Sequence, residues 1–141
     1  MPHTGHCLCG AVRYELAGEL GPPVACHCSY CRRAHGSPFS VVSLVRRADF
    51  RFTVGEEEVV TWDTPGGGQR VFCGRCATRI CNYPKKFPGS MSLVVASLDE
   101  EIEQAPVAHV NVESKAPWYE ITGDAPQFDA LPPNTQAALD G

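Results

Sequence analysis

The sequence predicts a mainly β fold of short antiparallel strands with little helix, and three observations lead to this class. Short segments that alternate apolar with polar residues, or that are rich in Val, Phe and Tyr, recur along the chain. The 141 residues include 13 glycines and 12 prolines, which supply frequent turns. Eight cysteines, most of them two or three positions from another, indicate that metal ions tie the short strands together.

Eight segments have the composition of strands. In chain order they are Ala11–Leu16, Val24–Cys28, Phe39–Val45, Phe50–Val54, Glu58–Trp62, Arg70–Cys73, Arg79–Tyr83 and Met91–Leu98. The last is the most apolar and is predicted to be a central strand. The three glycines at positions 66–68 predict a hairpin loop between the fifth and sixth segments.

Helix is predicted only as short turns. Ser29 is a candidate cap for one helical turn over residues 30–35, because Gly36 and Pro38 follow and would end it. A second helical turn is predicted at residues 134–139. The length fits a single domain, residues 1–141, without an internal repeat.

Composition argues against two classes of partner. A formal net charge of −4 disfavours binding to a phosphate backbone, so no nucleic acid is expected, although two or three arginines could still hold a small anion. The sequence contains no run of roughly 18 apolar residues, so a membrane-spanning helix is not expected. The first residues lack the apolar core of a secretory signal, so we expect a cytoplasmic protein, in which cysteines are more often metal ligands than disulfides.

Four cysteines suggest a closed metal site. Cys73 and Cys76 form a Cys-x-x-Cys knuckle, in which Gly74 suits a tight turn. Together with Cys7 and Cys9 they would supply four thiolates to a structural zinc, which contributes on the order of 10 kcal/mol to folding. Spacing alone leaves open which pair joins which, and redox-active or unliganded thiols are the alternative.

Three more cysteines, Cys26, Cys28 and Cys31, could bind a second zinc and leave one tetrahedral position open. Alternation along a strand puts His27 on the face opposite the first two. His35 could reach the metal as a fourth ligand, so catalytic and structural roles are equally compatible with the pattern. The eighth cysteine, at position 81, lies in an apolar strand and is predicted to be a buried core thiol.

An open zinc position with three thiolates would suit a soft fourth ligand, and a substrate thiol fits best. Such a thiol would stay deprotonated and could attack a carbonyl carbon. Arg32 and Arg33 follow the site and could hold carboxylates of the thiol substrate. The alternative is that both arginines form an ordinary solvated face.

Six segments of the chain carry a resemblance to a known family, in the order that the family has them: Gly5–Glu15, Cys26–Arg33, Gly36–Phe39, Arg70–Cys76, His109 and Lys115–Tyr119. They resemble the motifs of the glutathione-dependent formaldehyde-activating enzyme (GFA) family, which includes a centromere-associated branch. The chain departs from the usual family pattern after the Cys73–Cys76 knuckle, where Ala77-Thr78-Arg79 replaces Gly-Thr-Pro, and at Cys81.

The resemblance implies a β-tent-like fold of short antiparallel sheets held by two zinc ions per chain, with a core at about residues 5–122 and a tail at 123–141. It implies a structural zinc on the four-cysteine set and a catalytic zinc on the three-cysteine set. The implied activity is that of a carbon–sulfur lyase resembling S-(hydroxymethyl)glutathione synthase, which adds glutathione to formaldehyde or a related small aldehyde.

Three residues near the C-terminal end of the match are further candidates. Lys115 and Trp118 could line a pocket over the open zinc and bind the thiol substrate, or Trp118 could belong to the core. His109 could move a proton to the hemiacetal oxygen, or be satisfied by a backbone hydrogen bond. A non-catalytic zinc module for protein interaction remains the alternative function, and a fourth protein ligand at the second site would favour it. The sequence makes no prediction of oligomeric state.

Overall fold

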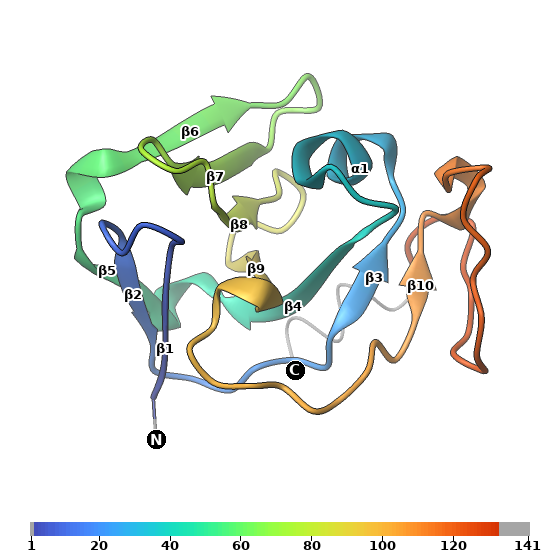
Figure 1. The fold of residues 1–141 in the computed structure, drawn as a ribbon, viewed down its shortest axis with the longest axis horizontal. Coiled ribbons are helices and arrows are strands. Elements are labelled where there is room, and N and C mark those ends of the chain that lie inside the picture. The colour runs from blue at the N-terminus through green and yellow to red at the C-terminus, as the bar shows by residue number, and fades with distance from the viewer. Residues whose placement is uncertain (1, 133–141) are drawn as a thin grey trace.

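The computed structural model describes residues 2–132, and these residues form two sheets (Figure 1). The smaller sheet has the strand order β1-β2-β5, with β1 at His3–His6, β2 at Arg13–Leu16 and β5 at Phe50–Val54. The larger sheet has the order β10-β3-β4-β9-β8-β7-β6. Its strands are β3 (Val24–Cys26), β4 (Ser40–Arg46), β6 (Val59–Asp63), β7 (Gln69–Cys73), β8 (Arg79–Tyr83), β9 (Ser90–Val94) and β10 (His109–Val110).

Little of the described chain is helical. One α-helix, α1, spans Ser29–His35. Three 3₁₀ turns lie between strands: η1 (Arg47–Asp49), η2 (Glu56–Glu58) and η3 (Val95–Ser97). A fourth, η4 (Val112–Ser114), follows β10. Among the described residues, no helix has the length and apolar character needed to cross a membrane. The turn predicted at 134–139 lies outside the described residues.

The predicted mainly β class is confirmed. All eight predicted strand segments overlap an observed strand, and β9 is central because three strands lie on each side of it in the larger sheet. The prediction for this segment was wrong at its end, since residues 95–97 leave the sheet as η3. The pairings are antiparallel except between β3 and β10, which run parallel with Val110 opposite Cys26.

The hairpin predicted at the three glycines joins β6 to β7. Thr64 closes it by donating its N–H to the carbonyl of Gly68 at 2.8 Å and accepting the N–H of Gly67 at 2.9 Å. The paired strands place Val59 opposite Cys73. The hairpin therefore delivers Cys73 to the end of β7.

The N-cap of helix α1 lies one residue earlier than predicted. Cys28 is the N-cap, and its sulfur accepts the N–H of Cys31 at 3.2 Å. Ser29 is instead the first helical residue, so the predicted role of its hydroxyl was wrong. Gly36 ends the helix with φ 59°, a left-handed conformation that favours glycine, and donates its N–H to the carbonyl of Arg32.

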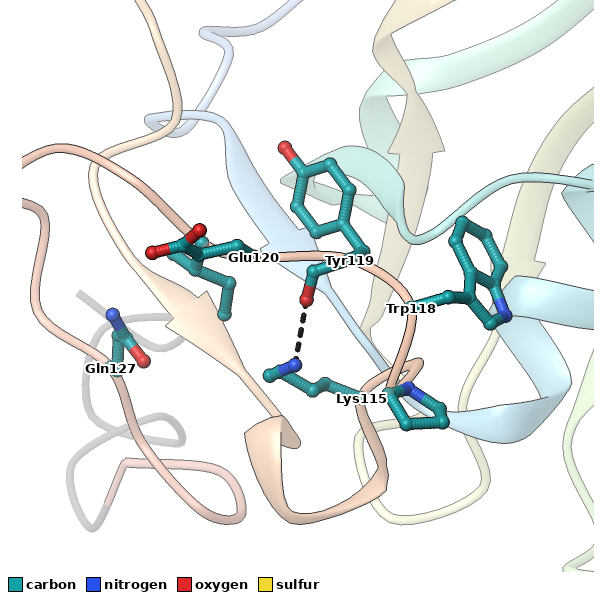
Figure 2. A pocket seen from close by; sticks show the side chains of 7 residues that line it. Lys115, Trp118, Tyr119, Glu120 and Gln127 are labelled. Carbon is teal, nitrogen blue, oxygen red and sulfur yellow. Dashed lines mark hydrogen bonds between the residues drawn. The ribbon is translucent and has the colours of Figure 1, made fainter.

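The segment after β10 folds back along it. Backbone hydrogen bonds join residues 109–113 to residues 126–130, including the Phe128 N–H to the His109 carbonyl at 2.8 Å. Between these stretches, the Lys115 ammonium donates to the Tyr119 carbonyl at 2.7 Å (Figure 2). It also donates to the Ala116 carbonyl at 3.1 Å. Lys115 thus organises the loop that carries it.

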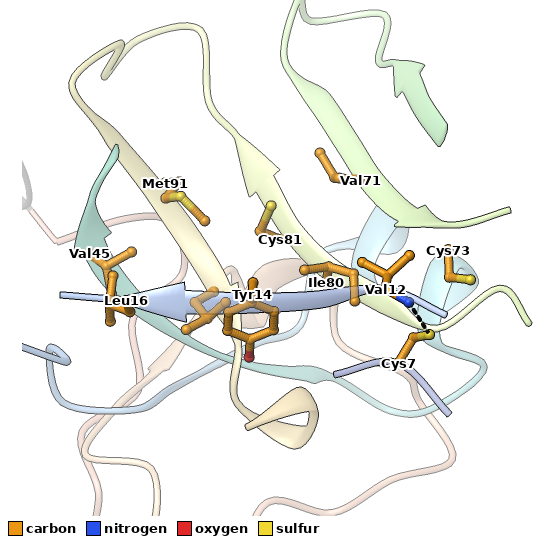
Figure 3. Packing of buried hydrophobic residues seen from close by; sticks show 11 residues of the cluster. Cys7, Val12, Tyr14, Leu16, Val45, Val71, Cys73, Ile80, Cys81 and Met91 are labelled. Atoms are coloured by element: carbon orange, nitrogen blue, oxygen red, sulfur yellow. Dashed lines mark hydrogen bonds between the residues drawn. The ribbon is translucent and has the colours of Figure 1, made fainter. Parts of the chain in front are cut away.

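Side chains from both sheets form one hydrophobic core (Figure 3). Its buried members are Cys7, Val12, Tyr14, Leu16, Val45, Val71, Cys73, Ile80, Cys81, Met91 and Leu93. The prediction that Cys81 is a core thiol is confirmed, and burial raises its pKa to about 12. Cys7 and Cys73 are also fully buried, so the core includes two thiols that are candidate metal ligands.

Candidate metal centres

Four thiols gather where the β1–β2 turn meets the β7–β8 turn. The sulfurs of Cys7, Cys9, Cys73 and Cys76 all lie within 4.8 Å of one another. The Cys7–Cys9 sulfur distance is 3.6 Å and the Cys9–Cys73 distance is 3.9 Å. Four sulfurs placed tetrahedrally about 2.3 Å from a zinc ion would be about 3.8 Å apart. The donor set and its spacing therefore fit zinc.

Backbone and hydroxyl groups surround these sulfurs as donors. Val12 donates its N–H to the sulfur of Cys7, and Arg75 donates its N–H to that of Cys73, both at 3.3 Å. The Thr78 hydroxyl lies 3.2 Å from the sulfur of Cys76 and lowers the pKa of that thiol to about 5. Hydrogen bonds of this kind favour thiolates, the form that binds a metal.

The turn of the Cys73–Cys76 knuckle differs in detail from its prediction. Gly74 is not left-handed; a side chain at this position would come within 2.9 Å of the Glu58 carbonyl and of Val60. Close approach to the start of β6 is thus the reason for glycine here. The left-handed position of the turn is Ala77, with φ 65°. An alanine in this conformation is strained.

The other three thiols come from the end of β3 and from α1. The sulfurs of Cys26, Cys28 and Cys31 lie within 4.8 Å of one another. Cys26 ends the strand, Cys28 caps the helix, and Cys31 lies one helical turn further on. A strand that passes directly into a helix therefore produces this triplet, which we call the three-thiol cluster.

Each sulfur of the three-thiol cluster accepts a hydrogen bond. Asn111 donates its side-chain amide to Cys26 at 3.3 Å, and the Cys31 N–H reaches Cys28 at 3.2 Å. Both terminal guanidinium nitrogens of Arg70 lie 3.6 Å from the sulfur of Cys31.

The sulfur contacts with Cys26 and Cys28, helped by the Arg70 charge, hold the pKa of Cys31 well below its ordinary value. The contact with Cys28 raises the pKa of Cys26 above its ordinary value. The three adjacent thiols thus differ in how readily they lose a proton, because neighbouring thiolates repel one another. A bound cation would offset this repulsion and allow all three to be thiolates. The chemistry of the cluster accordingly fits a thiophilic cation such as zinc.

Within residues 2–132, no histidine, aspartate, glutamate or further cysteine joins this group. His35 is not part of it; its Nε2 is buried without a hydrogen-bond partner. His27 points away, as predicted from the alternation. It is fully buried, and its Nε2 lies 2.9 Å from Nδ1 of His109. His109 is therefore satisfied by a side chain, whereas a backbone partner was the predicted alternative.

The four residues predicted to contact substrate lie in two places, two on α1 and two at a pocket. Arg32 is partly buried, and Arg33 is exposed on the same helix. Lys115 and Trp118 line one open pocket of about 330 Å³ (Figure 2), together with Pro117, Tyr119, Glu120, Ile121 and Gln127. Trp118 is 69% exposed, so the alternative that it belongs to the core was wrong. The cysteines do not line this pocket.

Two residues next to the sulfurs were not singled out by the sequence. Arg70 lies 39 residues from the cysteine that it contacts, and Asn111 lies 85 residues from its own. Only the pairing of β10 with β3, and the position of β7, bring them there. The sole local signal is the left-handed φ of 57° at Asn111, a conformation in which Asn is enriched.

Comparison with known proteins gives a consistent family. The model of the family described as "Glutathione-dependent formaldehyde-activating enzyme" (GFA) matches residues 2–114. Three relatives are provisionally named as glutathione-dependent formaldehyde-activating enzymes. They come from Halomonas elongata (28% identical, covering 83% of this chain and 79% of the relative), Colletotrichum graminicola (30%, 72% and 54%) and Podospora anserina (31%, 70% and 48%).

The chain spans about half the length of the two fungal relatives and most of the bacterial one. A crystal structure of a Rhodobacter sphaeroides protein is similar with a TM-score of 0.62 and 26% identity, over 71% of this chain and 91% of that one. The family match covers both groups of cysteines and the strands that carry them. The chain therefore belongs to the glutathione-dependent formaldehyde-activating enzyme family.

Proposed function

We propose that this protein is a zinc-dependent carbon–sulfur lyase that adds a thiol, glutathione, to formaldehyde or a related small aldehyde. The observation that carries the proposal is the three-thiol cluster, in which no fourth metal-binding side chain is present within residues 2–132. The names of the relatives support glutathione and formaldehyde as the first substrates to test. A cytoplasmic location remains a prediction.

Two zinc ions per chain would fit the two cysteine groups. The four-thiol group has a complete tetrahedral ligand set, which is typical of a structural site. At the three-thiol cluster, a bound zinc would supply an open coordination position and lower the pKa of a substrate thiol that enters it. Arg70 and Asn111 would stabilise the cluster sulfurs as thiolates and hold them in place.

The reaction balances without an external oxidant or reductant. The glutathione sulfur forms a bond to the carbonyl carbon, the C=O π bond breaks, and the thiol proton ends on the new hydroxyl oxygen. Burial lowers the pKa of both His35 and His109, so each is neutral near pH 7 and able to accept a proton. We propose these two histidines as candidates for that transfer.

Arg32 and Arg33 are the proposed contacts for the carboxylates of glutathione. They follow Cys31 directly on α1 and are basic residues of its last turn. The Lys115 ammonium donates to two carbonyls of its own loop. To contact substrate as proposed, it would donate its third N–H or share one of the other two. Trp118 offers an exposed ring on which a peptide-like ligand could pack.

The replacement Cys28→Ser tests the function. It removes one sulfur from the three-thiol cluster and leaves the four-thiol group intact. We expect zinc content to fall from two towards one per chain, the circular dichroism spectrum to be retained, and S-(hydroxymethyl)glutathione formation, followed by exchange NMR, to be lost. Cys81→Ala, which removes a thiol outside both groups, is the control and should keep two zinc ions.

Two results would contradict the proposal. Full activity of Cys28→Ser would show that the cluster is not the reaction site. Loss of folding as severe as that of Cys76→Ser, which breaks the four-thiol group, would make both groups structural and favour the non-catalytic interaction module.

A further inference from the structure

Two arginines meet beside the three-thiol cluster. Asn82 Oδ1 lies 3.5 Å from a terminal nitrogen of Arg70 and 3.1 Å from one of Arg79. Arg70 extends on to the sulfur of Cys31 at 3.6 Å. Arg70 is only 9% exposed, and Arg79 and Asn82 are partly buried. Two guanidinium groups and one amide thus form a connected set that reaches the cluster.

No acidic side chain neutralises this pair. Within residues 2–132, neither guanidinium has a carboxylate oxygen within 4.0 Å, whereas Arg51 and Arg75 do. The Nε atoms of Arg70 and Arg79 are both buried without a hydrogen-bond partner. Buried donors without acceptors are costly, and each one in a native protein calls for an explanation, which a bound anion would supply here.

The charges of Arg70, Arg79 and a zinc-loaded three-thiol cluster would leave one positive charge unbalanced. Three thiolates and one divalent cation would sum to a single negative charge, which Arg70 balances at its 3.6 Å contact. Arg79 then remains unbalanced. Burial, followed by the nearby Arg70 charge, lowers the pKa of Arg79, which means that its surroundings disfavour the cation. One anion placed here would relieve this unfavourable environment.

The set is held in a fixed geometry. The Asn82 amide donates to the Ser92 hydroxyl at 3.1 Å, which directs its oxygen toward the arginines. The Arg79 guanidinium carbon lies 5.5 Å from the centre of the Phe72 ring. Rigid, planar donors with free N–H groups are the arrangement that binds a carboxylate through two hydrogen bonds.

We propose that Arg70 and Arg79, fixed by Asn82, form a carboxylate subsite, so that the carbonyl substrate is an aldehyde bearing a carboxylate next to its carbonyl. This rests on the proposed function and narrows its substrate. The simplest member of the class is glyoxylate. Thiol addition balances as before: a C–S bond forms, the C=O π bond breaks, and the thiol proton ends on the new hydroxyl beside the carboxylate.

A carboxylate could also come from glutathione, and position favours the aldehyde. Arg70 directly contacts a sulfur of the cluster, so a group that it binds lies close to the reacting atoms. In glyoxylate the carboxylate is attached directly to the reacting carbon. In glutathione several bonds separate each carboxylate from the thiol, which places those groups further out, toward Arg32 and Arg33.

Substrate preference tests the subsite. The zinc-loaded protein would be assayed with glutathione and three aldehydes: glyoxylate, formaldehyde and methylglyoxal, which replaces the carboxylate by a neutral acetyl group of similar size. We expect kcat/KM for glyoxylate to exceed that for methylglyoxal by about tenfold or more. Arg79→Met should lower the glyoxylate-to-formaldehyde ratio by at least about tenfold, and Arg79→Lys should restore part of it.

Binding without turnover provides a second measurement. Calorimetric titration of glyoxylate into the protein, without thiol, should give an affinity that weakens about tenfold in Arg79→Met. Glutathione affinity should be unchanged in that variant. The control is Arg51→Met, which removes a side chain that is 68% exposed on β5, and which should alter neither the ratio nor the binding.

The outcomes separate this inference from the proposed function. Formaldehyde addition with no preference for glyoxylate, and no effect of Arg79→Met on the ratio, would overturn the subsite and leave the function standing. Glyoxylate binding that depends on Arg79 in a protein that adds no thiol to any aldehyde would overturn the function and keep the subsite. Weaker glutathione affinity in Arg79→Met would overturn the assignment to the aldehyde.

Discussion

At the scale of single residues, the strained alanine that follows the Cys73–Cys76 knuckle gives a direct prediction. Ala77 is exposed and has φ 65°, so a glycine would remove strain without loss of packing. After the greater chain entropy of glycine is deducted, Ala77→Gly should raise the free energy of unfolding by about 1 kcal/mol. Urea unfolding of the zinc-loaded protein measures this, with Ala34→Gly, in α1, as a control that should destabilise. A lower stability of Ala77→Gly would contradict the strain.

The buried pair of His27 and His109 predicts a dependence on pH. Burial lowers the pKa of both, so the folded protein resists protonation that the unfolded chain accepts below about pH 6.5. The unfolded state then binds more protons, and stability falls as pH drops through about 6.5 toward the folded pKa values.

His109→Gln removes one of these titrations and keeps a hydrogen-bonding group opposite His27. The loss of thermal stability between pH 7.5 and pH 6 should therefore be smaller in His109→Gln than in the unaltered protein. Scanning calorimetry of both proteins at equal zinc loading makes the comparison, because proton competition for the thiolates is common to the two. An equal or larger loss in the variant would show that His109 is not kept neutral by burial.

At the scale of elements, local pattern was sufficient to predict eight of the ten described strands and insufficient for β1 and β10. Segments such as Phe50–Val54 and Arg79–Tyr83 match their predicted bounds, because their alternation or apolar character persists over several residues. Strands β1 and β10 have few apolar side chains. They are strands because their backbones pair with β2 and β3, respectively. Residues 95–97 leave the sheet although Val95 and Ala96 are apolar, and the Ser97 hydroxyl donates to the Val94 carbonyl at 2.8 Å.

The candidate site also has a part that the sequence could predict and a part that it could not. The grouping of cysteines could be predicted, since two-residue and three-residue spacings bring sulfurs together within one turn or strand. The surroundings of the sulfurs could not. Arg70, Arg79 and Asn82 come from β7 and β8, while the thiols that they approach come from β3 and α1. Their proximity depends on where two parts of the same sheet place their side chains, which no local pattern encodes.

At the scale of the whole molecule, the two cysteine groups have different relations to the core. The four-thiol group joins the two sheets, because the β1–β2 turn belongs to the smaller sheet and the β7–β8 turn to the larger. Two of its members, Cys7 and Cys73, are fully buried in the core. The three-thiol cluster lies at the junction of β3 and α1, and none of its members belongs to that core.

This difference predicts that a chelator removes zinc in two stages. The three-thiol cluster offers one ligand fewer and leaves a coordination position that a chelator can occupy, so its zinc should leave first, with the circular dichroism spectrum and the unfolding midpoint almost unchanged. Zinc at the four-thiol group should leave later, together with loss of tertiary structure, because metal binding there is coupled to the packing of two sheets. A chromogenic chelator followed in parallel with near-ultraviolet circular dichroism distinguishes the stages. In Cys28→Ser the early stage should be missing and the late one retained, whereas release of all zinc in a single step that coincides with unfolding would show that both groups hold the fold.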